Sequence, residues 1–201
     1  MPGTKKIASV FLNIPYDTPF ENLYLAYVVG LTQLGLRIHA AFAVPNQGRL
    51  ATIIELIEQS EFSIHDLSRV QVSHGVPRFN MPLELGLALH RSHATNGKHR
   101  VFIFESKSRR AQRSTSDVNG IDPQVHKGSP DGLMSALRNV FRQPRDVTTV
   151  PEMLSSYRAV KRKLPQLRRN GGCRSLFEAA VFQDLTLAAL VQSQQIIARR
   201  K

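Results

Sequence analysis

Asp66 and Glu84 are the two side chains whose sequence setting points most directly to chemistry. Both lie in polar segments beside predicted strands or helix starts (residues 13–17, 65–69 and 78–84). Glu84 stands in the apolar run MPLELGL, where a carboxylate costs free energy unless it has a partner or faces a cleft. Two interpretations stay open: Glu84 is a reactive carboxylate in a cleft, or it caps the start of its own helix.

The helix predicted to carry Glu84 has start signals of its own. Asn80 is a residue type that caps helices, and Pro82 suits a first helical turn. We therefore expect Glu84 within that first turn, where the helix N-terminus partly offsets the cost of its charge. Gly86, two residues later, has no side chain and allows another backbone to approach closely.

These residues need a scaffold, which the alternation of apolar runs predicts. Runs typical of buried strands alternate with segments whose apolar residues recur at helical spacing. We predict strands at 7–14, 37–44, 62–68 and 100–106, and helices at 20–34, 49–60 and 80–92. This alternation indicates an α/β fold with an open, doubly wound parallel sheet. Because ligand groups gather at the carboxyl ends of such strands, we expect Asp17, Asp66 and Glu84 to meet in one cleft.

The chain changes character after residue 106. Residues 107–129 are polar and punctuated by Gly and Pro, which indicates a long loop, either a functional lid or a disordered segment. Helices are predicted at 130–143, 151–164 and 175–198. The last helix has an apolar face that either docks on the sheet or forms a dimer contact, made of Leu176, Ala180, Leu187, Leu190 and Val191. We divide the chain into an α/β domain at 1–145 and a basic helical extension at 146–201.

The net charge of +12 is concentrated in the second half of the chain. Residues 1–106 are nearly neutral, whereas the remainder carries eighteen Lys and Arg against seven Asp and Glu. Such asymmetry indicates either an anionic partner or a solvated basic face. Nucleic acid is one such partner, although the chain has no recognised nucleic-acid-binding motif and no interleaved aromatic residues.

Several classes of protein are disfavoured by what the sequence lacks. It has no GxxxxGK[ST] loop, no GxGxxG after the first strand, no HExxH and no Cys/His ligand spacing, so we expect no metal and no resident cofactor. No apolar run approaches the ~20 residues of a membrane span. The first residues do not resemble a secretory signal, and the single Cys173 agrees with a reducing compartment. We therefore expect a cytoplasmic protein that does not contact a membrane.

Four segments together resemble a bacterial family of small TIR-like, nucleotide-binding domains that are often met in antiphage defence. The segments are VFLNIPYD (10–17), FSIHDLSRV (62–70), RFNMPLELGLAL (78–89) and SDVNGI (116–121). In TIR domains, a strand ending in Ser precedes a helix with the catalytic Glu, and Ser68 and Glu84 have this order. Asp66 and the ELGLA of residues 84–88 are also similar to nucleoside 2-deoxyribosyltransferases. The resemblance implies a flavodoxin-like, TIR-like sheet.

Both families break N-glycosidic bonds, and the resemblance implies hydrolysis of NAD or a related nucleotide as substrate. A carboxylate can stabilise or trap the oxocarbenium-like centre that forms when the base leaves, a role that falls to Glu84. Asp66 would anchor the ribose or manage the proton on the leaving base. The expected substrate-binding residues are Asn13, Tyr16, Asp17, Ser68, Arg69, Arg78 and Asn80.

Three alternatives to an NAD hydrolase remain open. The same cleft would also suit a nucleoside 2-deoxyribosyltransferase-like enzyme, or a catalytically silent nucleotide sensor or protein-interaction module. In the silent module, the C-terminal helices would transmit nucleotide binding to a partner. A second copy of the chain and a partner protein of a defence system are the candidate protein partners, and nucleic acid ranks below them.

Overall fold

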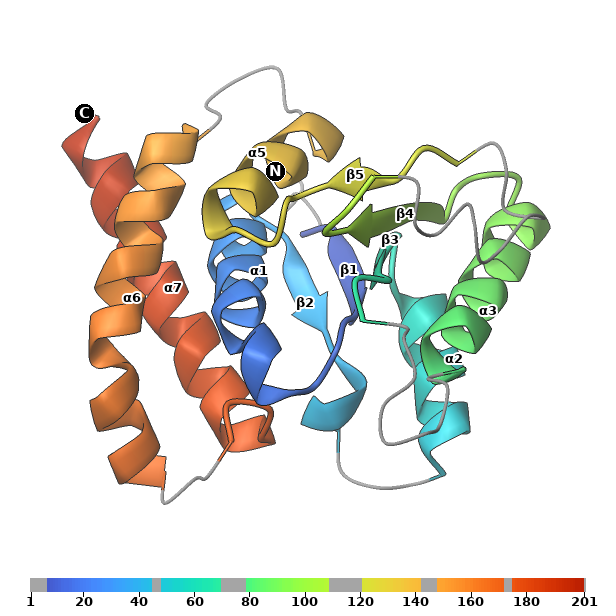
Figure 1. Ribbon diagram of the computed structural model, residues 1–201, viewed down its shortest axis with the longest axis horizontal. Coiled ribbons are helices and arrows are strands. Elements are labelled where there is room, and N and C mark those ends of the chain that lie inside the picture. Colours follow the sequence, from blue (N-terminus) through green and yellow to red (C-terminus); the bar gives the residue numbers. More distant parts are fainter. Residues whose placement is uncertain are drawn as a thin grey trace, which may run out of the picture.

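A single parallel sheet forms the centre of the molecule. The computed structural model describes residues 7–44, 48–69, 79–108, 121–141, 148–171 and 175–200. Five strands pair in the order β2-β1-β3-β4-β5, all parallel (Figure 1). They are β1 (Ser9–Asn13), β2 (Arg37–His39), β3 (Phe62–Asp66), β4 (Arg100–Glu105) and β5 (Gln124–Val125). This is the strand order of a flavodoxin-like sheet, so the predicted open parallel α/β sheet is confirmed.

The two edge strands depart from the sequence-based expectation. The strand predicted at 37–44 ends at His39, and a 3-10 turn, η2 (Ala41–Ala43), follows it. The segment 107–129 was predicted to be a loop, but within it β5 pairs with the end of β4. β5 has only two residues and no apolar run, which is why periodicity gave no signal for it.

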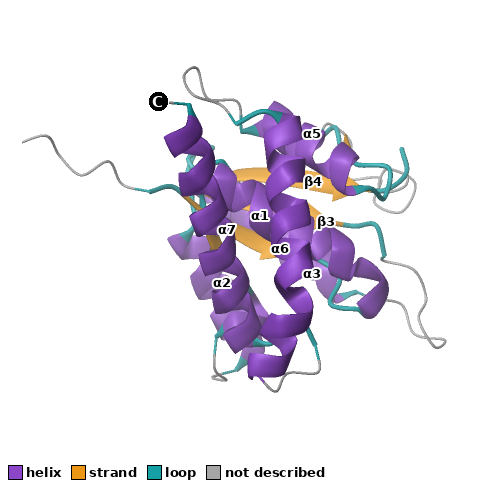
Figure 2. Cartoon of the chain, turned by 90° about the vertical axis from the view of Figure 1, so that its left-hand side faces the viewer, coloured by secondary structure: helices purple, strands orange, loops and turns teal. Residues whose placement is uncertain are grey.

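Helices cover both faces of the sheet. They are α1 (Glu21–Gln33), α2 (Arg49–Gln59), α3 (Asn80–Ala94), α5 (Pro130–Val140), α6 (Val150–Gly171) and α7 (Ala179–Arg199), with a 3-10 turn, η1 (Thr18–Phe20), before α1. Helices α2 and α3 pack on one face, and α1 and α5 pack on the other. Helices α6 and α7 contact each other and the outer side of α1 (Figure 2). The fold therefore has an extra helical layer on the α1 side.

Helix α1 is buried on every side, and this explains its composition. All residues from Leu23 to Gln33 are buried, because the sheet covers one side of the helix and α6 and α7 cover the other. A helix buried all round is expected to be apolar all round rather than amphipathic. The α1 sequence ENLYLAYVVGLTQ meets this expectation, so the C-terminal helices are needed to keep α1 out of water.

The basic extension predicted at 146–201 shares its hydrophobic core with the α/β part. Met153 and Val160 of α6 belong to the same buried cluster as the α1 side chains. The apolar set predicted for the last helix does not dock on the sheet, because only Leu176, which precedes α7, is fully buried while Leu187, Leu190 and Val191 are exposed; the alternative dimer contact stays a prediction. The residues of α7 that pack inward are Val181, Phe182, Leu185 and Ala189. This helix has apolar residues on two sides, so spacing alone does not select the buried one.

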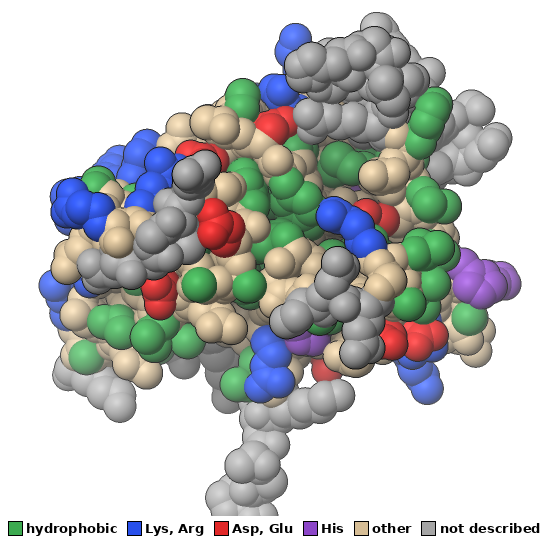
Figure 3. Space-filling view, turned by 90° about the horizontal axis from the view of Figure 1, so that it is seen from below, with side chains coloured by type: hydrophobic (Ala, Val, Ile, Leu, Met, Phe, Trp, Pro, Cys, Tyr) green, Lys and Arg blue, Asp and Glu red, His purple; other side chains and the backbone are tan. Residues whose placement is uncertain are grey.

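Positive charge gathers at the end of the molecule formed by the C-terminal helices (Figure 3).

Helix α6 runs through Pro165 to Gly171, seven residues beyond its predicted end. Pro165 removes one backbone hydrogen bond, but it lies on an exposed side of the helix, where water can satisfy the freed carbonyl. Within the described ranges, no helix has the length and apolar content required to cross a membrane.

Candidate functional site

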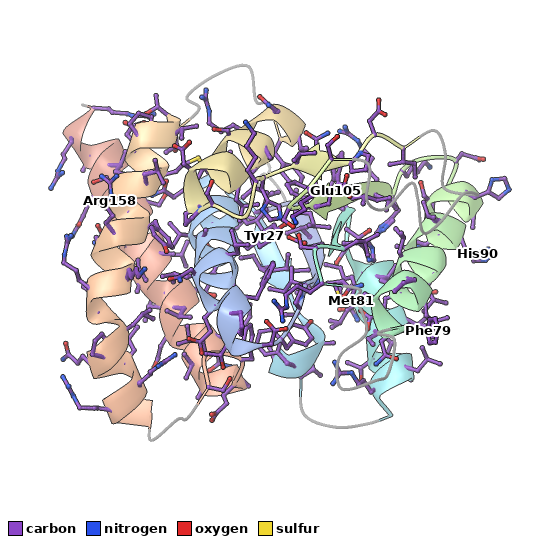
Figure 4. The ribbon with its side chains drawn as sticks, viewed as in Figure 1. Tyr27, Phe79, Met81, His90, Glu105 and Arg158 are labelled. Carbon is purple, nitrogen blue, oxygen red and sulfur yellow. The ribbon has the colours of Figure 1, made fainter. Side chains whose placement is uncertain are left out.

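Asp66 is the centre of a buried polar network at the carboxyl end of β3. Its side chain is 0% exposed. The Tyr27 hydroxyl donates to Asp66 Oδ2 at 2.8 Å, and the Ser68 backbone N–H donates to Oδ1 at 2.9 Å. His126 Nε2 lies 3.1 Å from Oδ2. Figure 4 places Tyr27 between α1 and the sheet. Three donors compensate the desolvation of this carboxylate.

His126 joins the network with a defined tautomer. The backbone N–H of Gly128 donates to His126 Nδ1 at 3.1 Å, so the ring proton sits on Nε2. Nε2 faces both Asp66 Oδ2 and the Ser68 hydroxyl, the latter at 3.0 Å. In a Ser-His-Asp relay, the acid and the serine contact opposite ring nitrogens. Here they share one nitrogen, so the arrangement is a structural network and not a nucleophile with its base.

The turn that carries His126 is fixed by the start of α5. Ser129 caps this helix by accepting a hydrogen bond from the Gly132 N–H at 3.1 Å, and Pro130 occupies the first turn. A Cβ added to Gly132 would lie 2.2 Å from the carbonyl oxygen of His126. Glycine is therefore required where this helix start meets the turn, and the turn holds the imidazole against Asp66.

Asn13 connects β1, β3 and the first turn of α3. Its amide nitrogen lies 3.0 Å from His65 Nδ1 and 3.3 Å from the carbonyl oxygen of Met81. Burial, with a smaller contribution from His99, lowers the pKa of His65 to about 3. The imidazole is therefore neutral and accepts from the Asn13 amide at Nδ1. Asn13 itself, an expected substrate-binding residue, is only 2% exposed. Its hydrogen bonds in the structure link α3 to the sheet.

Glu84 has a different setting from Asp66. It is 7% exposed and makes no hydrogen bond or ion pair within the part of the chain that the structure describes. Burial raises the pKa of the Glu84 carboxyl to about 7, and the nearby Arg49 guanidinium opposes this shift. Burial, followed by the charge of Glu84, also raises the pKa of the Tyr16 phenol. The Arg49 guanidinium lies 5.9 Å from the centre of the Tyr16 ring.

Tyr16, Arg49 and Glu84 therefore form a cluster, which we call the Glu84 cluster, supplied by the β1–α1 loop, the start of α2 and α3. The predicted helix-start role of Glu84 is wrong. Helix α3 begins at Asn80, has Phe79 at its cap position with no side-chain cap hydrogen bond, and has no acidic residue in its first turn. Asn80 is thus the first helical residue and not the cap. Glu84 in the second turn does not satisfy the helix N-terminus.

The surroundings of α3 correct one further expectation. Among the described residues, a Cβ added to Gly86 would have no atom within 4 Å, so none of their backbone approaches this glycine closely and the predicted close approach is wrong. Phe79 is 71% exposed beside the helix start (Figure 4). Asn80, an expected substrate-binding residue, is also exposed to solvent at this helix start.

An ion pair links two loops at this edge of the sheet. Arg69 Nε lies 2.7 Å from Asp17 Oδ2, which joins the loop after β3 to the loop after β1. The Arg69 side chain remains 42% exposed. Arg78, an expected substrate-binding residue, and residues 109–120 of the loop predicted at 107–129 lie outside the described residues.

The predicted site residues thus divide into two groups. Asp66 and Ser68 belong to the network with Tyr27 of α1, whereas Glu84 lies near Tyr16 and Arg49 in the Glu84 cluster. The expected meeting of Asp66 and Glu84 in one cleft is not supported by these contacts. Asp66 has no exposed surface, so the predicted contact with a ribose or a leaving base is not available to it.

Sequence reasoning missed the partners that complete both groups. Tyr27 and His126 lie 39 and 60 residues from Asp66 in the chain, and Arg49 lies 35 residues before Glu84. A single sequence contains no local signal for such pairs. A third buried carboxylate, Glu105, ends β4; only its place at the end of a predicted strand could have drawn attention to it.

The chain has no match among protein-family models, curated proteins or solved structures. Within the described ranges, His, Cys, Asp and Glu side chains form no group of three or more that could hold a metal ion.

Proposed function

We propose that this chain hydrolyses the N-glycosidic bond between nicotinamide and ribose in NAD or a related nucleotide, with Glu84 as the catalytic carboxylate. The observation that carries the proposal is the contrast between the two carboxylates. Asp66 is saturated by three donors, whereas Glu84 is mostly buried and has a pKa raised to about 7. Strongly perturbed carboxyl groups at the ligand-binding edge of an α/β sheet are functional-site candidates.

One reactive carboxylate suits a substrate whose leaving group is already cationic. When the C1–N bond of the nicotinamide riboside breaks, the bonding electrons pass to the pyridinium nitrogen and nicotinamide leaves as a neutral molecule. No proton has to be delivered to it. The sugar becomes oxocarbenium-like, and an ionised Glu84 stabilises that positive charge. Water then adds to C1 and loses a proton, which gives ADP-ribose, nicotinamide and H⁺.

Neutral nucleosides make a larger demand on the site. Departure of adenine or thymine requires a proton on the base, which is the work of a second acidic group. Asp66 is enclosed and hydrogen bonded, and thus not available for this role. This difference favours NAD over nucleosides and a hydrolase over a 2-deoxyribosyltransferase.

Two guanidinium groups at the carboxyl edge of the sheet support the binding of a substrate with a diphosphate. Arg49 at the start of α2 and Arg69 after β3 provide guanidinium groups near the same edge, and guanidinium groups bind phosphate oxygens in a bidentate manner. The positive charge of a bound nicotinamide riboside would also lower the pKa of Glu84. Substrate binding would thus ionise the carboxylate that the reaction needs.

The test is a substrate panel. The purified protein is incubated with NAD, NADP, ribonucleosides and 2-deoxyribonucleosides, the last also with a free acceptor base, and products are separated by chromatography. Release of nicotinamide without release of bases from nucleosides supports the proposal. Base exchange between deoxynucleosides would identify a transferase instead, and binding of NAD without any product would identify the silent nucleotide-binding module.

A further inference from the structure

The outer face of α6 carries positive charge that the proposed reaction does not use. Residues 153–177 contain seven Lys and Arg and no Asp or Glu. The inner face of α6 packs into the core through Met153, Tyr157 and Val160. Arg158 and Arg162 lie on the opposite, exposed side of the helix (Figure 4 labels Arg158).

Three arginines form a regular stripe on this face. At 3.6 residues per turn, Arg158, Arg162 and Arg169 point within about 40° of one another, and they span about 16 Å along the helix axis. All three are exposed. Within the described part of the chain none of the three forms an ion pair. Their charge is therefore directed to solvent.

Two neighbouring cations of α6 already have partners. Lys161 donates to Asn22 Oδ1 at 2.8 Å, and Arg168 pairs with Glu21 at 2.7 Å. These contacts tie one flank of α6 to the start of α1. Glu152 near the start of α6 is paired with Arg200 at 2.5 Å. The stripe is thus not neutralised by the acidic residue of its own helix.

The chemistry of the stripe selects the kind of partner. None of the exposed large apolar residues of the described chain lies on α6, whereas a membrane-surface helix or a protein interface needs apolar anchors. The only aromatic residue of α6, Tyr157, is 7% exposed, so no ring is available to stack on the bases of a single strand. Guanidinium groups in a row without apolar or aromatic anchors fit a regular array of phosphates.

We propose that the outer face of α6, through Arg158, Arg162 and Arg169, binds the phosphate backbone of a nucleic acid duplex without reading its sequence. This function goes beyond the proposed glycohydrolase activity. Each phosphate that an arginine neutralises adds about −0.9 to the slope of log K against log salt concentration. Three such contacts therefore make the slope steeper by about 2.7. Affinity should also be the same for duplexes of unrelated sequence.

The experiment measures fluorescence anisotropy of a labelled 20-base-pair DNA duplex titrated with the full chain at several salt concentrations. The test variant carries Arg158→Gln, Arg162→Gln and Arg169→Gln. A control variant with the same net charge carries substitutions at three exposed cations away from α6, namely Arg37→Gln, Lys98→Gln and Lys107→Gln. Melting curves establish that both variants fold.

The expected result is duplex binding by the wild type, a salt slope shallower by about 2.7 in the α6 variant, and a nearly unchanged slope in the control. If the wild type releases nicotinamide from NAD, both variants should release it at the same rate. If the wild type has no such activity, the result on duplex binding still stands. Equal losses in both variants, no duplex binding at low salt, or tighter binding to a single strand or to phosphatidylserine vesicles would overturn the proposal.

Discussion

Replacing Glu84 with glutamine should change how the stability of the protein depends on pH. Gln has nearly the same shape as Glu but does not titrate. In the folded protein, burial raises the pKa of Glu84 from 4.5 to about 7. In the unfolded chain the group should titrate near its ordinary value.

The sign of the effect follows from proton binding. Below pH 4.5 the carboxyl group is protonated in both states and contributes no pH dependence. Between 4.5 and 7 the unfolded state releases the proton while the folded state retains it, so the free energy of unfolding of the wild type falls as pH rises. Above pH 7 the Glu84 carboxyl group is ionised in both the folded and the unfolded state, so the free energy of unfolding falls no further. A pKa displaced from 4.5 to about 7 corresponds to about 3 kcal/mol.

The assay is urea denaturation of the wild type and Glu84→Gln at intervals from pH 4.5 to 8.5. The Gln variant should gain up to about 3 kcal/mol relative to the wild type across this range. Glu55→Gln, at an exposed position of α2, serves as the control and should show no such gain. If the free energy of unfolding changed with pH in the same way for the wild type and Glu84→Gln, the conclusion that ionising Glu84 destabilises the folded protein would be refuted.

Three further substitutions test other parts of the account. Tyr27→Phe removes one donor from buried Asp66 and should lower the free energy of unfolding by about 1–3 kcal/mol, measured by urea titration; an unchanged stability would contradict the network. Gly86→Ala, at an exposed helical position with open space around it, should raise stability by about 1 kcal/mol, seen as a higher Tm. Arg49→Gln removes the cation that opposes the raised pKa of Glu84, so the pH profile of nicotinamide release should move to higher pH; a shift to lower pH would exclude this coupling.

The sheet was largely predictable because its central elements have strong local patterns. The run IASVFLNI gave β1, and the apolar stretch from Phe20 to Leu34 gave α1. The elements that were missed or misjudged depend on contacts distant in the chain. β5 exists because Gln124 and Val125 pair with the end of β4. The inner face of α7 is selected by α1 and α6, which pack against it.

The candidate site was predictable in its residue types but not in its partnerships. Strand ends and the apolar company of Glu84 identified both carboxylates. Their different settings depend on residues of other elements: Tyr27 of α1 donates a hydrogen bond to Asp66, and the charge of Arg49 opposes the raised pKa of Glu84. Periodicity predicts which side of an element is apolar, but it does not predict which polar groups meet across elements.

The catalytic role of Glu84 is tested by nicotinamide release from NAD by the wild type and by Glu84→Gln at pH 8. We expect equal amounts of nicotinamide and ADP-ribose from the wild type, and a rate lower by about 10²–10³-fold or more in the folded Gln variant. Glu55→Gln should retain the wild-type rate. Turnover by Glu84→Gln at the wild-type rate would contradict the claim that this carboxylate carries the reaction.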